Sequence, residues 1–301
     1  KYGGTTKALT LSGEGNFYVD SGILAIEGSN PNFAAKKTVA AAAYVTITDK
    51  AGLGSGDIVN DGTVALSKVT GAFDYNMTGT GKLDLSDSKV EIRRDWANYH
   101  GAVEAKSAST FTVNANLSNT DVKISAGSLL KGNGFIHSLE SSGTTAPGNS
   151  IGTMQIVTNF TPAPNHIYEC EVDTNGNSDR IVVGGTATLN GILKVVPMAG
   201  NYQSGQTYTY TILTSGNLIT TTFPIVSGTS PLFSYNVVYQ PNAVQLQMLR
   251  NASIAQSLKL QGNAGATATA FDSIQNPTGA MKTLSDNLNS WTQEQISNEF
   301  N

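Results

Sequence analysis

The chain has 301 residues, 39% apolar and 13% charged, so it can bury a large core while exposing little charge. Its 18 Lys and Arg against 22 Asp and Glu give a net charge of -4, which argues against nucleic acid or an anionic membrane as partner, because either requires a basic surface. The single cysteine, Cys170, excludes an intramolecular disulfide, so packing must supply the stability.

The sequence also limits how this chain relates to membranes and export. No apolar run approaches the ~20 residues that a membrane-spanning helix requires. The first residues, from Lys1 to Gly4, lack the apolar core of a signal peptide. We therefore expect the sequence to be a processed piece of a longer protein.

From Gly13 onwards, short alternating apolar segments follow corners built from Gly or Asn-Asp, as half-buried strands require. The major units recur about every two dozen residues with variable corners, which is typical of stacked rungs. This pattern predicts a right-handed parallel β-helix, with a β-sandwich as the alternative. Strands are expected at 22–26, 61–66, 81–85, 89–92, 111–113 and 122–124.

The stretch from Leu129 to Thr158 shows the same plan most clearly. Apolar side chains alternate at 153–156 and around Phe135, with no helical periodicity. The corners fall at residues that suit positive or preset φ angles, namely Gly132, Gly134, Pro147, Gly148 and Gly152. We assign residues 1–160 to the β-helical stem.

The texture changes after the stiff segment Thr161 to Asn165. Longer strands rich in Tyr are expected at 167–172, 181–183, 187–196, 207–214, 235–239 and 244–249. The Asn190-Gly191 step predicts a hairpin turn between 187–189 and 192–195. Residues 161–250 are therefore predicted to form a compact, partly antiparallel end unit.

These residues carry a resemblance to a known family. The run from Leu130 to Gly134, followed by Pro147 to Thr153, resembles the transport-associated repeat in passenger domains of type Va autotransporters of Gram-negative bacteria. The run C-terminal to this repeat resembles the autochaperone, or pertactin-like, segment of that family. Its matching residues are Tyr168–Glu171, Ser178–Asp179, Gly185–Gly191, Leu193, Val195, Gly200–Tyr202, Gly205, Tyr210–Thr214 and Pro231–Phe233. The match covers roughly residues 127–250. Residues 1–126 resemble the family only in having β-helical repeats, as many proteins do.

Beyond Arg250 the strand pattern stops. Helix-forming residues cover 252–260, 264–274 and 281–300, with breaks expected at Gly262, Gly265 and the Asn276-Pro277 step. The resemblance implies that residues 251–301 form the α-helical linker towards an outer-membrane β-barrel, whose alternating strands are absent here. An ordinary amphipathic helix docked on the core is the alternative.

Two motifs resemble functional sites only by their letters. Gly148 to Gly152 matches the nucleophile elbow, but Pro147 precedes it and a strand comes after it, so we interpret it as a structural corner. The oxygen-rich run from Asp173 to Asp179 resembles a calcium loop, yet it lacks the required Gly and Glu and has no flanking helices. A turn satisfied by its own Asx side chains is favoured, with a weak calcium site as the alternative.

No other set of residues predicts a metal, cofactor or catalytic site. His100, His137 and His166 are far apart and are interpreted as surface or corner residues, and Cys170 as a small buried residue. The dense patch Arg93-Arg94-Asp95-Trp96, with Tyr99 and His100 nearby, is interpreted as a solvated loop with a tucked Trp; a contact site for sugar or protein is the alternative.

The resemblance implies a non-enzymatic passenger fragment, secreted or displayed on the bacterial surface, whose C-terminal part nucleates and caps β-helix folding during translocation. The partners it implies are the chain's own β-barrel, the outer-membrane barrel assembly machinery and periplasmic chaperones. A surface adhesin stalk that binds host molecules, and so acts in virulence, is one alternative. Another is a β-helical polysaccharide-degrading enzyme, for which Asp84, Asp87, Glu91, Arg93 and Arg94 supply suitable side chains.

Overall fold

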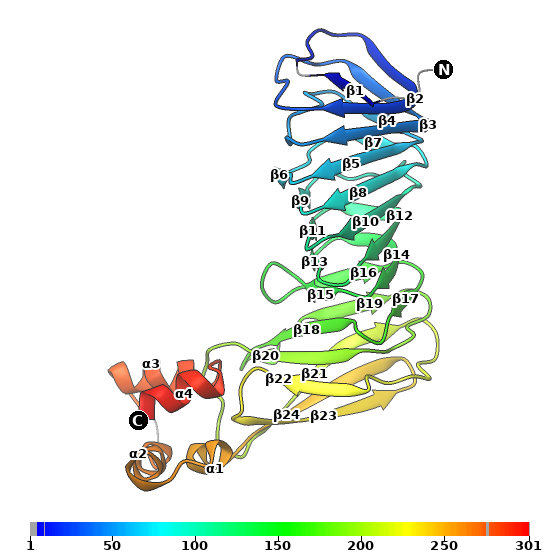
Figure 1. The fold of residues 1–301 in the computed structure, drawn as a ribbon. Helices are drawn as coiled ribbons and strands as arrows, with labels where there is room; N and C mark the ends of the chain where they lie inside the picture. Colours follow the sequence, from blue (N-terminus) through cyan, green and yellow to red (C-terminus); the bar gives the residue numbers. More distant parts are fainter. Residues whose placement is uncertain (1–4, 9, 275–276, 301) are drawn as a thin grey trace.

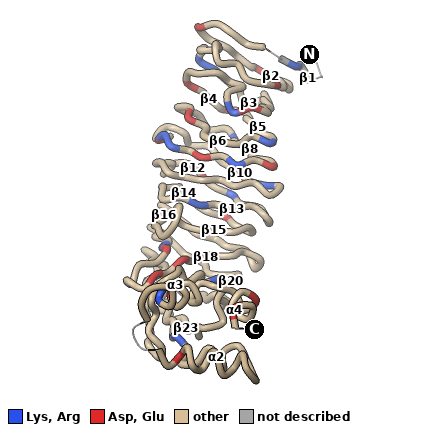
Figure 2. The backbone as a smooth tube through the Cα atoms, turned by 90° about the vertical axis from the view of Figure 1, so that its left-hand side faces the viewer, with Lys and Arg blue, Asp and Glu red and all other residues tan. Residues whose placement is uncertain are grey.

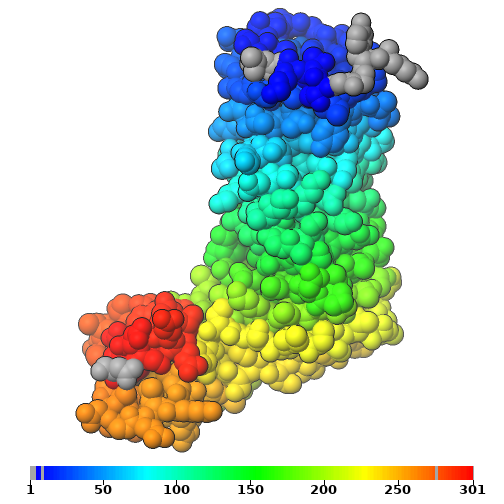
Figure 3. All heavy atoms as spheres, in the orientation of Figure 1, coloured from blue at the N-terminus to red at the C-terminus, as the bar shows by residue number. Residues whose placement is uncertain are grey.

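The computed structural model describes residues 5–8, 10–274 and 277–300. It shows a parallel β-helix that stands as a column, with four short helices beside its C-terminal end (Figure 1). In the space-filling view the column and the helices form an L-shaped molecule (Figure 3). The predicted all-β parallel β-helix is therefore confirmed, and the β-sandwich alternative is wrong.

Two long sheets form the walls of the column. The 16-stranded sheet contains, in spatial order, β1 (Thr5–Ala8), β2 (Asn16–Ile26), β3 (Lys36–Ile47), β5 (Thr63–Ser67), β8 (Lys82–Ser86), β10 (Ala102–Lys106), β12 (Asn116–Ile124), β14 (Phe135–Ser141), β16 (Thr153–Ile156), β19 (Arg180–Val183), β21 (Thr207–Ser215), β24 (Ala243–Arg250) and β23 (Phe233–Gln240), with β4 (Ile58–Asn60), β7 (Met77–Thr78) and β17 (Phe160–Pro162) beside this path. The 8-stranded sheet contains β22 (Ile225–Gly228), β20 (Ile192–Pro197), β18 (Ile167–Val172), β15 (Thr144–Pro147), β13 (Leu129–Gly132), β11 (Thr110–Val113), β9 (Lys89–Ile92) and β6 (Thr70–Ala72).

Parallel pairing in register stacks like side chains into columns. Val64 lies opposite Leu83, which lies opposite Val103, and Val122 and Leu139 continue the same row. All five are buried, because every second side chain of a strand points into the core. Burying one such aliphatic side chain contributes about 1.5–3 kcal/mol, which no single rung can obtain without its neighbours.

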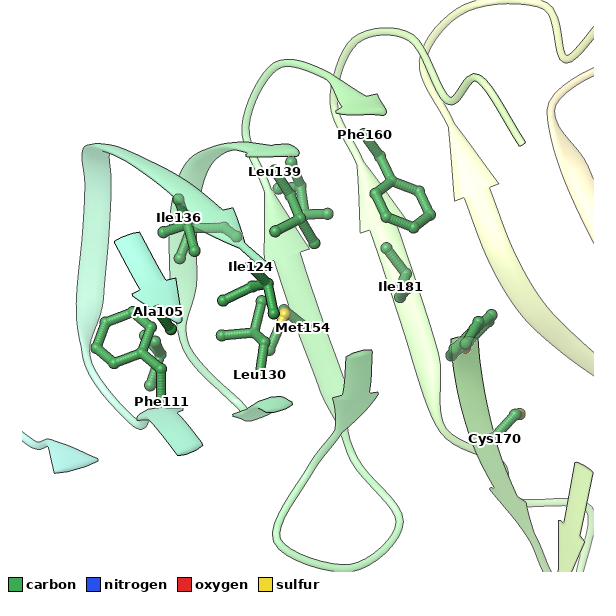
Figure 4. Close-up of a cluster of buried hydrophobic side chains, with 14 of the residues drawn as sticks. Ala105, Phe111, Ile124, Leu130, Ile136, Leu139, Met154, Phe160, Cys170 and Ile181 are labelled. Carbon is green, nitrogen blue, oxygen red and sulfur yellow. The ribbon is translucent and has the colours of Figure 1, made fainter. Parts of the chain in front are cut away.

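The facing sheet supplies the other half of the core. Phe111 lies opposite Leu130 in register. The Phe111 ring lies beside Ala105, and Leu130 lies beside Ile124 and Met154, which all belong to the 16-stranded sheet (Figure 4). Each of these side chains is at most 1% exposed. The core is therefore one continuous apolar column between the two sheets.

A serine ladder fixes one corner of the column. The Ser88 hydroxyl accepts from the Val69 N–H at 3.0 Å, the Ser109 hydroxyl from the Ser88 N–H at 3.1 Å, and the Ser128 hydroxyl from the Ser109 N–H at 3.2 Å. All three serines are buried. Each hydroxyl thus satisfies a corner N–H that would otherwise be left without a partner inside the protein.

The hairpin predicted at Asn190-Gly191 is wrong. β20, which begins just after this step, pairs in parallel with β18 and β22, and residues 188–190 form no strand. Gly191 has a φ of 76°, and a Cβ there would lie 2.3 Å from the His166 carbonyl oxygen. The step is a β-helix corner, which needs the same positive φ that a hairpin turn needs.

Parallel pairing continues through the region assigned to the end unit. β16 pairs with β19 and β19 with β21, while β15 pairs with β18 and β18 with β20. Antiparallel pairing begins only where β21 (Thr207–Ser215) meets β24 (Ala243–Arg250). The chain therefore continues to add rungs beyond residue 160 before its direction of pairing changes.

The last fifty residues are helical, as predicted. They form α1 (Ile254–Leu258), α2 (Gly262–Asp272), α3 (Gly279–Leu288) and α4 (Gln293–Phe300). Two details differ from the prediction: Gly265 lies inside α2 rather than at a break, and the expected helix at 281–300 divides at residues 289–292. Asn276 lies outside the described residues.

One charged side chain is buried inside the N-terminal rungs. The Lys37 side chain lies in the core, and its Nζ donates to the carbonyl oxygens of Leu53, at 2.9 Å, and of Ser55. The rings of Phe33 and Tyr75 lie 5.4 and 5.5 Å from the ammonium group. Burial lowers the pKa of Lys37 to about 8.

Candidate functional site

The C-terminal end of the β-helix is closed by a hairpin. β24 runs antiparallel to β21 on one side and to β23 on the other, and a two-residue loop, Pro241-Asn242, joins β23 to β24 (Figure 1). Because the antiparallel strand β24 occupies the second edge of β21, no further parallel strand pairs with β21 among the residues that the structure describes. We call β21, β23 and β24 together the cap.

The hairpin loop is tied to the last corner of the β-helix. The Asn242 side-chain amide donates to the carbonyl oxygens of Ser215, at 3.0 Å, and Gly216, at 3.2 Å. The Ser215 N–H donates to the Asn242 carbonyl at 2.9 Å, and the Ile219 N–H to the Pro241 carbonyl at 2.7 Å. The Pro-Asn pair is a common turn sequence, so the loop could be recognised in the sequence. The contacts of the loop with the last corner have no such signal in the sequence.

Tyrosine hydroxyls join the cap, and the loop that precedes β21, to the preceding rungs. Tyr168 donates to the Ile212 carbonyl oxygen at 2.7 Å, Tyr202 to that of Val172 at 2.9 Å, and Tyr210 to that of Asp173 at 2.6 Å. Burial raises the pKa of each of these phenols, so they remain neutral donors. The Tyr-rich texture of this region therefore has a structural cause: phenols span the interior and satisfy buried carbonyls.

An aromatic cluster holds the first residue of β23. The Phe233 ring lies edge-on to Tyr202, with centroids 5.0 Å apart, and Tyr202 contacts Tyr208 in the same way at 5.1 Å. The Arg250 guanidinium lies 5.9 Å from the Phe233 centroid. Phe233 is 5% exposed, so the hairpin is anchored in the core at this end.

Arg250 also joins the cap to the helices. Its Nε donates to Asn289 Oδ1 at 2.7 Å, and Asn289 Nδ2 donates to the Gly200 carbonyl at 3.0 Å. The Gly200 N–H in turn donates to the Asp286 carbonyl at 2.9 Å. Burial lowers the pKa of Arg250, and the nearby Asp272 carboxylate opposes that effect. A polar cleft of about 360 Å³ lies beside this clasp.

A buried carboxylate organises the loops that lead into the last rungs. Asp179 is 1% exposed, and its two oxygens accept from the backbone N–H groups of Gly152, at 2.8 Å, and Glu171, at 3.0 Å. Burial raises the pKa of Asp179 to about 7, although both hydrogen bonds oppose the rise. In the sequence, Asp179 is recognisable only as the last residue of the oxygen-rich run. Its hydrogen-bond partners cannot be inferred from the sequence.

The oxygen-rich run is a self-satisfied turn, as predicted. Asp173 Oδ1 accepts from the N–H groups of Asn175 and Asn177, both at 2.9 Å, and its other oxygen accepts from the Asn177 side chain at 2.8 Å. Within the described residues, no group of three or more His, Cys, Asp or Glu side chains is placed to hold a metal ion.

The Gly148 to Gly152 motif lies in a corner between β15 and β16, with no helix after the serine. This confirms its structural interpretation. Gly148 has a φ of 90°, and a Cβ there would lie 1.8 Å from the Ser150 carbonyl oxygen. The residue is therefore glycine because the loop folds back on itself.

The histidines and the cysteine lie apart from one another. His100 is exposed and His137 half-buried, whereas His166 is a fully buried corner residue whose Nδ1 lies 2.9 Å from the Ser141 hydroxyl. Burial lowers the pKa of His166 to about 4. Cys170 is fully buried in β18, and burial raises the pKa of its thiol, as expected of a packing residue.

The Arg93 patch is a solvated loop with a tucked Trp, as predicted. Trp96 is fully buried, its Nε1 donates to the Tyr75 carbonyl at 2.9 Å, and its ring lies edge-on to Tyr99 at 5.5 Å. Arg93 and Arg94 remain exposed, and Arg93 forms an ion pair with Asp74.

The five residues considered for polysaccharide degradation fall in different places. Asp84 lies on β8 of the 16-stranded sheet, where it forms ion pairs with lysines at 2.8 and 3.1 Å, while Glu91 lies on β9 of the facing sheet. Asp87 is a corner residue with a φ of 51°. The structure brings Arg93 and Arg94 together and places Glu91 close enough to interact electrostatically with Arg93, but Asp84 and Asp87 lie elsewhere.

Comparison with known proteins gives two partial similarities. The chain is 31% identical over 151 residues to the uncharacterized lipoprotein YdeK of Escherichia coli (strain K12), which covers 48% of this chain and 11% of that protein. It is 27% identical over 237 residues to the extracellular serine protease of Serratia marcescens, which covers 73% of this chain and 22% of that protein. The chain thus spans at most about a fifth of either relative.

No model of a known protein family matches the chain. Among the described residues, none of the helices is both long and apolar enough to span a bilayer. The parallel β-helix and the similarity to an extracellular protein together fit a passenger domain of an autotransporter.

Proposed function

We propose that this chain belongs to the passenger of a type Va autotransporter and that its C-terminal end caps the β-helix and nucleates its folding outside the cell. The names of both relatives, an extracellular protease and a lipoprotein, favour a surface or secreted location. In this proposal residues 130–153 include the transport-associated repeat, the cap belongs to the autochaperone segment, and residues 251–301 form the linker.

The observation that carries the proposal is the change in pairing direction at the cap. A parallel rung can form only when a chain segment some twenty residues away is already in place; Val64 pairs with Leu83, for example. The β23–β24 hairpin needs only a two-residue loop. It can therefore form early and offer an ordered edge for slower, non-local rungs.

The cap also suits the end of a repeat array. An uncapped β-helix exposes backbone donors and acceptors that pair with other chains, so terminal units are specialised. Here Tyr168 of β18 donates to the Ile212 carbonyl of the cap, and Tyr210 of the cap donates to the Asp173 carbonyl, so side chains tie the cap to the preceding rung. The proposed partners are those that export requires: the chain's own β-barrel, the barrel assembly machinery and periplasmic chaperones.

We further propose that the described rungs act without catalysis, as a displayed stalk. Asp84 and Glu91 lie on different sheets and Asp87 lies at a corner, which supports this view, because glycoside hydrolysis requires two carboxyl groups that flank one bond. Host cell-surface molecules are then proposed partners of the stalk rather than substrates, as expected of a virulence factor.

The test compares two phenylalanines in the intact chain. Phe233→Ala truncates the cap anchor and Phe111→Ala truncates a fully buried ring in the middle of the column, and each should cost about 3–5 kcal/mol of unfolding free energy. Folding and unfolding rates are measured in urea by tryptophan fluorescence. If the cap nucleates folding, Phe233→Ala slows folding with a φ-value approaching 1, whereas Phe111→Ala mainly speeds unfolding.

The opposite pattern would contradict the proposal. If Phe111→Ala slows folding as much as Phe233→Ala, the cap forms no earlier than the middle of the column. Phe233→Leu and Phe111→Leu provide a milder matched pair should either alanine variant fail to fold.

A further inference from the structure

The corner loops of three successive rungs form a groove on the side of the column. Two adjoining hollows, of about 390 and 400 Å³, share Asp57, Arg93 and Arg94. Lys50 and Asp74 line the first hollow. We call these five residues and the loops that carry them the corner groove.

Among the described residues, the corner groove holds two cations, Lys50 and Arg94, and one carboxylate, Asp57, that form no ion pair. Asp74 pairs with Arg93, and the nearby Asp95 accepts from the Asn116 N–H at 2.7 Å. Within the described part of the chain, Lys50 and Arg94 form no ion pair, and Arg94 makes a single bond, to the Asp74 carbonyl at 3.3 Å. Among the five residues of the corner groove, the two unpaired cations therefore outnumber the one unpaired carboxylate, on a chain with a net charge of -4 whose charged residues are sparse along the column (Figure 2).

An aromatic stack beneath the groove holds its loops in place. Tyr75 donates to the carbonyl oxygens of Lys50, at 3.1 Å, and Gly54, at 2.9 Å, and Trp96 donates to the Tyr75 carbonyl. The Phe73 ring lies 4.6 Å from the ring of Tyr75 and 6.4 Å from that of Trp96. A groove that is ordered before binding loses little conformational entropy when a ligand arrives.

The lining of the groove selects among anionic ligands. Apart from the buried Tyr75, its apolar side chains are the half-buried Ala51 and Ala72, so a peptide would find no pocket for an apolar anchor. Asp57 and Asn76 instead offer hydrogen-bonding groups along the groove, as sugar hydroxyls require. The groove crosses three rungs, which are each about 4.8 Å apart, so it suits an extended chain.

We propose that the corner groove binds an acidic polysaccharide, with carboxylate or sulfate groups on Lys50 and Arg94 and sugar hydroxyls on the neighbouring polar side chains. The groove lies on the side of the column, away from the cap. This inference therefore does not rest on the proposed role of the cap.

The test titrates the full chain with a sulfated oligosaccharide from heparin, a carboxylate-only oligosaccharide from hyaluronan, and neutral dextran, by calorimetry. Lys50→Ala/Arg94→Ala should weaken binding of the acidic sugars by about tenfold or more, because charge-assisted hydrogen bonds are lost. Lys89→Ala/Lys123→Ala is the matched control, since it removes two exposed lysines outside the groove and gives the same net charge. It should bind as the unmodified chain does.

The two acidic sugars distinguish sulfate from carboxylate as the recognised group. Binding should weaken with added salt, because the contacts are exposed charges. Failure of the unmodified chain to bind either acidic sugar would overturn the proposal. So would equal weakening in both double variants, which would show attraction by overall charge, or equal binding of dextran. Circular dichroism of each variant verifies that the fold is retained.

Discussion

Replacing Asp179 by Asn should change how stability depends on pH. In the folded chain the two carboxylate oxygens accept from two backbone N–H groups, and the side chain is 1% exposed. An amide offers only one acceptor, so one of these N–H groups loses its partner. Such a buried, unpaired donor costs about 1–3 kcal/mol. Below pH 4, where the carboxyl group is protonated in both the folded and the unfolded state, Asp179→Asn should therefore be less stable than the unmodified chain by at most this amount.

The magnitude of the pH effect is set by the pKa of Asp179. Burial raises it from 3.8 to about 7, so between these values the folded state binds a proton that the unfolded state does not. Stability from this group is therefore greatest below pH 4 and falls as the pH rises to 7, by about 4 kcal/mol for a shift of about three units. The amide side chain of the variant does not titrate, so Asp179→Asn removes this loss. Between pH 4 and pH 8, the unfolding free energy of the variant should therefore rise relative to that of the unmodified chain by up to about 4 kcal/mol.

The assay is equilibrium urea unfolding from pH 4 to pH 8, followed by tryptophan fluorescence, since Trp96 is fully buried in the column. The difference between variant and unmodified chain isolates Asp179. The pKa of His166 is lowered to about 4 in the folded state, so its contribution to stability falls as the pH falls below 6.5. This contribution is the same in both proteins. If Asp179→Asn instead loses more stability at pH 8 than at pH 5, the two N–H bonds outweigh burial and the reasoning is refuted.

Three further outcomes are expected. Ala108→Gly should raise the unfolding free energy by about 1 kcal/mol in urea titrations, because Ala108 is exposed and has a φ of 59°, where glycine is not strained. Stability should rise between pH 8 and pH 10.5, since the pKa of Lys37 is lowered to about 8 in the folded state only; in urea titrations Lys37→Met should abolish this rise. Arg250→Met should make the helices protease-sensitive while the column stays protected, because Asn289 loses its partner; unchanged cleavage would show that apolar packing alone holds the helices.

The rungs were predictable from sequence because each strand carries its own signal. Residues 81–85 alternate apolar and polar side chains behind a glycine, and β8 occupies nearly the same residues. Stacking in register requires this period of two in every rung, so local pattern and global fold agree. The Tyr-rich strands after residue 161 were identified in the same way.

The partners of those strands were less predictable. At Asn190-Gly191 a hairpin and a β-helix corner both require a positive φ, and only the position of the next strand distinguishes them. The clasp of Arg250 and Asn289 joins residues 39 apart, and the Asp179 carboxylate binds a backbone N–H 27 residues away. Such contacts have no period and no fixed spacing, so the candidate site had to come from the structure.

The geometry of the cap gives a physical reason for a direction of folding. Closing a loop costs free energy that grows as the logarithm of its length, so a loop of about twenty residues costs about 2 kcal/mol more than a two-residue turn. Each parallel rung requires the larger free energy of loop closure before its apolar side chains are buried. The β23–β24 hairpin requires only the smaller one of a two-residue turn. Once β24 has paired with β21, β21 offers an ordered edge with which β19, the strand of the next rung, can pair. We therefore propose that the β-helix grows from its C-terminal end towards its N-terminal end, because this route has the lowest first barrier.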